Sequence, residues 1–70
     1  MQKWEYITMK HWLAANLRER IVSIGGAEKT RVANDGFALL PFLNKLGGQG
    51  WELIGVDLEN DFYVFKRPLD

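Results

Sequence analysis

The sequence contains no cysteine, one histidine and two prolines among its 70 residues. The lack of cysteine excludes a disulfide and any thiolate metal site. A zinc site built from several imidazoles within one chain is also excluded, because His11 is the only histidine. Domains of this size usually gain stability from a disulfide, a metal or a partner subunit. We therefore expect no cofactor and predict that the protein forms a homo-oligomer.

Long hydrophobic runs are also missing, and no apolar stretch approaches the roughly 20 residues that span a bilayer. The N-terminal segment 1–5 lacks the apolar core of a signal peptide. We therefore expect a cytoplasmic protein with no membrane partner. The length predicts a single small domain over residues 1–70.

The formal net charge is zero, with nine basic and nine acidic residues, which argues against general binding to double-stranded DNA. The charges are unevenly distributed along the chain. Residues 10–31 contain five basic and two acidic residues, a net charge of +3, whereas residues 32–70 contain three basic and six acidic residues, a net charge of −3. The basic segment either pairs with the acidic one, within a chain or between subunits, or binds an anion.

Two segments are rich in the aromatic and β-branched residues that favour strands, namely Lys3–Met9 and Trp51–Leu58. A third strand is expected to begin at Asp61 or Phe62 and to end before Pro68, since proline cannot continue the ladder. The short polar turn at 59–61 predicts that the last two strands form a hairpin.

Apolar residues recur at helical spacing over Trp12–Ile24, which predicts an amphipathic helix ended by Gly25 and Gly26. The β-branched content of residues 20–24 leaves an alternative. In that case residues 20–24 and 29–32 form a hairpin around the two glycines.

A further helix is expected to begin near Phe37 or Ala38 and to reach Leu46, because Pro41 is comfortable only in the first helical turn. Gly47 then follows as the start of its C-terminal cap. The predicted fold class is α+β, a three-stranded antiparallel sheet with one or two helices in the order strand, helix, helix, strand, strand.

Alternation of side chains along the strands gives the predicted sheet two apolar faces. One helix can cover only one face, so the Trp12–Ile24 segment or another subunit must cover the other. At roughly 25 cal/mol per Å² of apolar surface, leaving the aromatic side chains in water would forfeit several kcal/mol. We therefore predict that the aromatic face is the oligomer interface. The expected aromatic face comprises Trp4, Tyr6, Trp51 and Leu53, and the expected aliphatic face comprises Ile7, Met9, Ile54, Val56 and Leu58.

Four short motifs cover about half of the chain at a specific spacing. They are Trp4-Glu5-Tyr6, Phe42-Leu43-Asn44-Lys45-Leu46-Gly47, Gly50-Trp51-Glu52-Leu53-Ile54 and Phe65-Lys66-Arg67-Pro68. With these motifs the chain resembles a small prokaryotic and phage family without an assigned function. Its members begin W-E-Y, carry L-N-x-L-G-x-x-G-W-E-L and end with F-K-R-P. The resemblance implies a short α+β unit with an antiparallel sheet and brings no catalytic or ligand residues. It leaves the segment 10–32 as an elaboration beyond the shortest members.

The sequence contains no complete motif for catalysis or ion binding. The glycines at 47–50 follow a predicted helix and precede a strand, the reverse of a phosphate loop. The acidic residues at 57, 59 and 61 lack the glycine and the final acid of a calcium loop. Ser23 and His11 are each the only residue of their type and have no third group at a recognisable spacing. The sequence therefore predicts that the protein is not an enzyme and holds no metal.

Aromatic residues interleaved with basic ones are the remaining signal. Aromatic rings stack on bases, and guanidinium groups grip phosphates, so a nucleotide or a short single-stranded nucleic acid is the natural ligand. The alternative is that Trp12 anchors a core or interface and that the arginines are solvated. The candidate ligand-binding residues are Trp12, Arg18, Arg20, Lys29, Arg31, Tyr63 and Arg67.

The sequence thus favours a non-enzymatic, oligomeric binding or interaction module. One alternative is a sequestering protein that captures a small anionic signal, such as a cyclic nucleotide, between subunits, as small phage proteins do against host defence. Another is an inhibitor that docks on a host protein.

Overall fold

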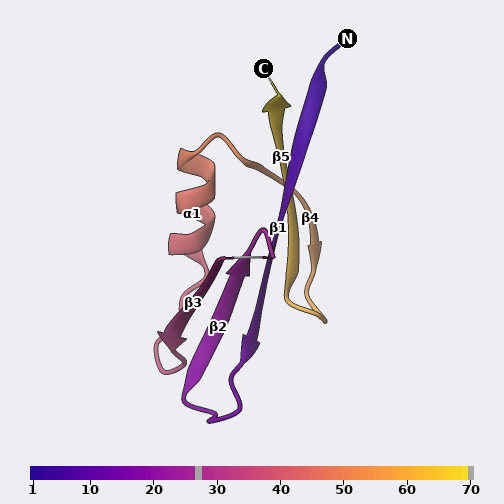
Figure 1. Cartoon of the computed structure of the whole chain (residues 1–70). Coiled ribbons are helices and arrows are strands. Elements are labelled where there is room, and N and C mark those ends of the chain that lie inside the picture. Colours follow the sequence, from indigo (N-terminus) through magenta and orange to yellow (C-terminus); the bar gives the residue numbers. More distant parts are fainter. Residues whose placement is uncertain (27, 70) are drawn as a thin grey trace.

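The longest strand, β1 (Lys3–Leu13), lies at the centre of a five-stranded antiparallel sheet in the residues that the structure describes, 1–26 and 28–69. This structure is a computed structural model, and Figure 1 shows the sheet with a single helix beside it. The strand order is β3-β2-β1-β5-β4, where the further elements are β2 (Glu19–Ile24), β3 (Glu28–Ala33), α1 (Leu40–Gly48), β4 (Glu52–Asp57) and β5 (Phe62–Leu69).

The predicted three-stranded sheet with one or two helices is wrong, because the expected helix over Trp12–Ile24 is instead the end of β1, a turn and β2. The hairpin alternative describes this segment, since β2 pairs antiparallel with β3. Gly25 and Gly26 make the connecting turn with φ of 67° and 80°. Pairing of the β-branched β2 with a strand on each side outweighs the local helical spacing. Leu17, with φ of 61°, turns the chain between β1 and β2 and is incompatible with a continuous helix.

The strands expected around Lys3–Met9 and Trp51–Leu58 are confirmed as β1 and β4, and the final strand is confirmed as β5. β5 continues through Pro68, where the sequence predicts an end. β4 begins at Glu52, which pairs with Lys66 of β5, so the β5 residues after Lys66 have no partner in β4. Pro68 therefore lies where β5 is paired with β1 only. A proline is tolerated at such an edge position.

The helix α1 begins a few residues later than the sequence predicts, with Pro41 in its first turn, and includes both glycines, Gly47 and Gly48. The expected cap at Gly47 is therefore wrong, since the helix continues to Gly48, and the glycine with a positive φ just after it is Gly50, at 88°. Among the described residues, no helix is long and apolar enough to cross a membrane.

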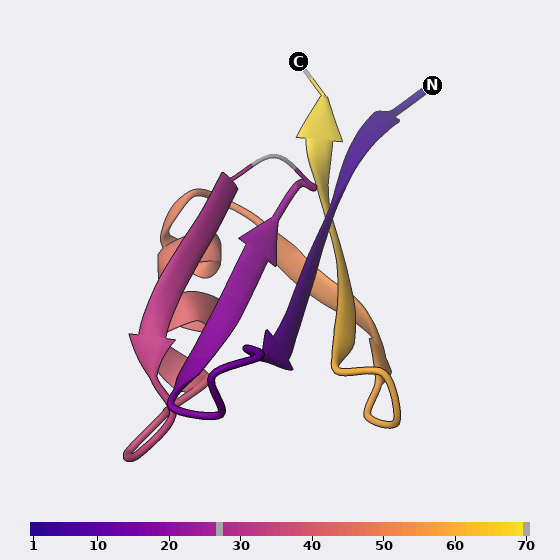
Figure 2. The ribbon, with the colours of Figure 1, turned by 60° about the horizontal axis from the view of Figure 1, so that its bottom comes forward.

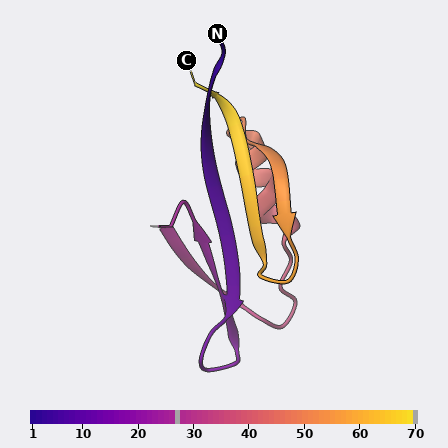
Figure 3. The same ribbon diagram turned by 90° about the vertical axis from the view of Figure 1, so that its right-hand side faces the viewer.

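The hydrophobic core lies between α1 and one face of the sheet. Figures 2 and 3 show the helix on one side of the strands. Leu46 of α1 is 1% exposed and packs among the buried sheet residues Met9, Val22, Ile24, Tyr63 and Phe65. We call this the helix face and the opposite side the open face. By the strand registers, the open face carries Trp4, Tyr6, Thr8, Lys10, Trp12, Ile21, Ser23, Lys29, Arg31, Phe62, Val64 and Lys66.

The expected aromatic face is not a single face. Trp4 and Tyr6 lie on the open face, whereas Leu53 pairs with the buried Phe65 on the helix face and Trp51 packs against the core. The reason is that β5 separates β1 from β4, and the pairs Tyr6↔Lys66 and Lys66↔Glu52 place Glu52 on the side of Tyr6. A register shift between Leu53 and Gly55 then changes the alternation along β4. The four predicted interface residues are therefore divided between two faces.

Candidate ligand-binding site

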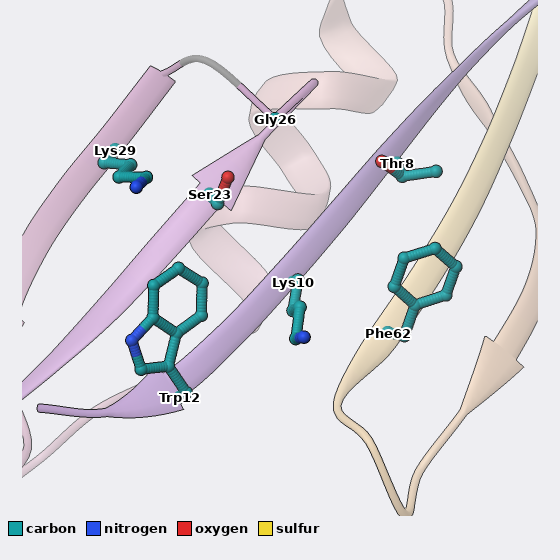
Figure 4. Close-up of a pocket in the computed structure, with 7 residues that line it drawn as sticks. All are labelled: Thr8, Lys10, Trp12, Ser23, Gly26, Lys29 and Phe62. Atoms are coloured by element: carbon teal, nitrogen blue, oxygen red, sulfur yellow. The ribbon is translucent and has the colours of Figure 1, made fainter.

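A hollow of about 570 Å³ lies on the open face of the sheet, over its central strands. One row of register partners crosses it from β3 to β5, because Lys29 pairs with Ser23, Ser23 with Lys10, and Lys10 with Phe62. Trp12 lies on the same face one alternation further along β1. Figure 4 shows these side chains on the side of the sheet away from α1. Among the residues that the structure describes, the lining comprises Thr8, Lys10, Trp12, Ser23, Gly26, Lys29 and Phe62.

The lining combines two ammonium groups with two aromatic rings. Lys10 and Lys29 lie two strands apart, which places their backbones roughly 10 Å from each other with the hydroxyl of Ser23 between them. Long lysine side chains on such a spacing can approach one anion from both sides, and the hydroxyl can donate to it. Trp12 and Phe62 lie near Lys10 and offer ring faces or edges to a planar group. The hollow is therefore suited to a ligand that joins an anion to an aromatic ring.

A second polar cluster lies on the helix face and is centred on His11, which is 6% exposed. The Nε–H of Arg20 donates to Nδ1 of His11 at 2.9 Å, and Nε2 of His11 lies 3.2 Å from the hydroxyl of Tyr63. The guanidinium of Arg20 also reaches the carboxylate of Asp61 at 3.3 Å and the side-chain oxygen of Asn34 at 3.4 Å. Each of these side chains has a hydrogen-bond partner within the cluster.

Burial lowers the pKa of His11, and the positive charge of Arg20 lowers it further, while the nearby carboxylate of Asp61 works in the opposite direction. The pKa of Tyr63 is raised, first by burial and then by the charge of Asp61. The imidazole and the phenol are therefore both held neutral. Because the side chains are buried and mutually paired, we interpret this cluster as support for the turn at Asp61, whose φ is 50°.

Arg67 occupies a separate position near the protruding end of the β1–β5 pair. It forms an ion pair with Glu5, donates to the carbonyl oxygen of Gln49 at 2.9 Å and lies over the ring of Trp51 at 4.1 Å. A smaller hollow of about 400 Å³ adjoins these groups. Since the carboxylate of Glu5 already faces the guanidinium there, this hollow is a poorer place for an anion.

The seven predicted ligand-binding residues do not form one site. Trp12 and Lys29 line the hollow, and Arg31 lies on the same face but pairs with Glu19 at 3.6 Å. Arg18 lies in the turn between β1 and β2. The other three predicted residues, Arg20, Tyr63 and Arg67, lie on the helix face in the contacts described above.

Five of the lining residues are not among those predicted from the sequence, namely Thr8, Lys10, Ser23, Gly26 and Phe62. A signal for two of them exists in the sequence, because the alternation that begins at Trp4 and Tyr6 continues through Thr8 and Lys10 to Trp12. Placing Ser23 and Phe62 beside Lys10 requires the register of β2 and β5. No group of three or more His, Asp or Glu side chains capable of holding a metal occurs in residues 1–26 and 28–69.

Comparison of the chain with protein-family models, curated proteins and solved structures finds no match in any of the three. The resemblance to the small prokaryotic and phage family stays a prediction from the motifs.

Proposed function

We propose that this protein is a non-enzymatic binding module that holds a nucleotide, free or as part of a short single strand, on the open face of its sheet. The observation that carries this proposal is the row of Lys29, Ser23, Lys10 and Phe62, with Trp12 beside it. A phosphate between the two lysines would leave the attached base within reach of the aromatic rings. Base stacking on an aromatic side chain contributes about 1–3 kcal/mol, and it tolerates different bases.

The rigidity of the platform supports binding on this face. Thr8, Lys10 and Trp12 project from a strand that has neighbours on both sides over Met9–Lys10, so their spacing is fixed before a ligand arrives. A hollow of about 570 Å³ lies in the range of roughly 300–1,000 Å³ that small-molecule sites occupy. The site is therefore large enough for a mononucleotide.

The chemistry of the lining favours capture without turnover. Within the described part of the chain, its side chains include no carboxylate or imidazole that could act as a general base. The buried imidazole of His11 projects to the opposite face and is engaged with Arg20 and Tyr63. This arrangement fits sequestration of a small anionic signal as well as binding to a strand, because both ligands present the same phosphate and base.

Titration of the protein with AMP and with a short oligothymidylate, monitored by tryptophan fluorescence, tests the proposal and separates the two sources. We expect quenching by at least one of them and its loss in Trp12→Ala, while Trp51→Phe, altered on the helix face, keeps it. Equal affinity for AMP and for the oligonucleotide indicates a mononucleotide ligand, whereas much tighter oligonucleotide binding with a steep salt dependence indicates a strand. Absence of binding to either probe would contradict the proposal.

A further inference from the structure

The N-terminal half of β1 has a neighbouring strand on one side only. β5 pairs with β1 from Lys3 to Lys10, but β2 pairs with it only from Met9 to Leu13. The turn at Gly25 ends the contact on the β2 side, where its N–H donates to the carbonyl oxygen of Thr8 at 2.8 Å. In Figures 1 and 3 the β1–β5 pair extends beyond the end of β2. The stretch Lys3–Ile7 is therefore an open sheet edge within the described chain.

The direction of the backbone groups at this edge follows from the Thr8 contact. The N–H and C=O of one strand residue point to the same side, and alternate residues point to opposite sides. Since the carbonyl of Thr8 points toward β2, the backbone groups of Trp4 and Tyr6 also point to that side and meet no described strand. Those of Glu5 and Ile7 point toward β5. The edge thus presents unpaired donors and acceptors at Trp4 and Tyr6, a template for another strand.

The outer edges of β3 and β4 carry features that discourage such pairing. β4 has an irregularity between Leu53 and Gly55, and β3 carries the charged side chains of Lys29 and Arg31. The β1 edge has no such irregularity, its charged residues Lys3 and Glu5 have opposite signs rather than the same sign, and it carries Trp4 and Tyr6, which are 40% and 62% exposed. Of the three described edges, it is the one best suited to accept a strand.

We propose that a second copy of this chain pairs antiparallel with this edge, so that Trp4 lies opposite the partner's Trp4. In this register Lys3 lies opposite the partner's Glu5, and Glu5 opposite the partner's Lys3. Opposite charges directly across a strand pair are stabilising, and this complementarity identifies a copy of the same segment as the occupant. Centring the pair on Glu5 instead would set carboxylate against carboxylate. It would also shift the partner strand along β1, so that the partner's N-terminus approaches Gly25.

The pairing has a consequence for the whole assembly. A two-fold axis perpendicular to the sheet keeps both open faces on the same side. The sheets of the two copies then join edge to edge, and the two tryptophans meet on the open face beside Lys66, whose ammonium lies over the ring of Trp4 at 4.2 Å. The interface contains none of the residues that line the hollow, so the two hollows remain accessible and face the same direction.

Analytical ultracentrifugation of Tyr6→Pro and Tyr6→Ala tests the use of the backbone at this edge. Proline removes the N–H that faces the partner but no bond to β5, whereas alanine removes only the side chain. We expect a wild-type dimer, and a dissociation constant at least tenfold higher for Tyr6→Pro than for Tyr6→Ala. A monomeric wild-type protein at high micromolar concentration, or a folded Tyr6→Pro that dimerises as tightly as Tyr6→Ala, would overturn the proposal.

Single-cysteine cross-linking tests the register even if the proline variant does not fold, because the chain has no native cysteine. Trp4→Cys should cross-link to its own copy with a short thiol-specific reagent, since facing residues in such a pair lie about 5.5 Å apart. Tyr6→Cys should not, because its copy lies about 13 Å away along the strand. Efficient cross-linking of a cysteine at Trp12 or Lys29 in place of Trp4 would show that the open faces pack on each other and would refute the edge pairing.

Discussion

Arg20 and His11 are joined by a hydrogen bond in which the Nε–H of the guanidinium donates to Nδ1 of the imidazole at 2.9 Å. The bond exists only while Nδ1 carries no proton, because a protonated imidazole has no acceptor. The guanidinium of Arg20 also forms an ion pair with Asp61 at 3.3 Å. The side chain of Arg20, in β2, therefore links His11 of β1 to the turn before β5. The protonation state of His11 therefore affects how these three parts of the sheet are held together.

Stability should fall as the pH drops below neutrality. The folded-state pKa of His11 is below the value of 6.5 for a free histidine, so the unfolded chain binds the proton more readily. The contribution of His11 is thus complete above pH 6.5 and is lost progressively below it, at no more than about 1.4 kcal/mol per pH unit. Urea denaturation between pH 7.5 and 5.5 measures this slope, which should be smaller in His11→Gln. Equal slopes in the two proteins would contradict a neutral, buried His11.

Replacing Arg20 should destabilise the protein even when a positive charge is kept. In Arg20→Lys the ammonium cannot reproduce the separate bonds to His11, Asn34 and Asp61, so we expect a loss of about 1–3 kcal/mol in the free energy of unfolding. Arg18→Lys, altered in the exposed turn, should change it by less than about 0.5 kcal/mol. Chemical denaturation distinguishes the two, and an Arg20→Lys protein as stable as Arg18→Lys would show that the cluster contributes nothing.

The turn between β1 and β2 offers a stabilising substitution. Leu17 has φ of 61° and is 70% exposed, so it occupies a left-handed conformation without burying its side chain. Leu17→Gly relieves the steric penalty of roughly 1–2 kcal/mol that a β-carbon meets there, offset in part by the greater freedom of the unfolded chain. We expect a higher melting temperature for Leu17→Gly. Leu58→Gly, at another exposed leucine without positive φ, should lower it, and the reverse order of the two variants would contradict the assigned backbone conformation.

The sequence predicts the elements whose signal is local. The aromatic and β-branched residues of Lys3–Met9 and Trp51–Leu58 indicate strands in any context, and Pro41 limits where α1 can begin. The segment Trp12–Ile24 carries helical spacing and strand composition together, and pairing with β1 and β3 decides between them. Local sequence cannot supply that pairing.

The candidate site is predicted only in part, because its residues are brought together by strand pairing that local sequence does not reveal. Trp12 and Lys29 can be recognised in the sequence as an aromatic and a basic residue of the basic segment. That both line one hollow follows only from the strand pairing, in which Ser23 lies between Lys10 and Lys29. Arg20 and Tyr63 look equally suited to a ligand in the sequence. The strand registers place both on the helix face, where their charge and hydroxyl are used within the fold.

The affinity of two β3 variants for AMP and oligothymidylate, measured by titration calorimetry, tests the open-face site most directly. Lys29 lines the hollow, whereas Arg31 lies on the same strand and face, outside the lining and paired with Glu19. The proposal predicts that Lys29→Gln weakens binding about tenfold or more, as loss of a charged contact of about 1.5–3 kcal/mol implies, and that Arg31→Gln changes it little. Equal effects of the two substitutions, or wild-type affinity in Lys29→Gln, would contradict the assignment of the hollow as the binding site.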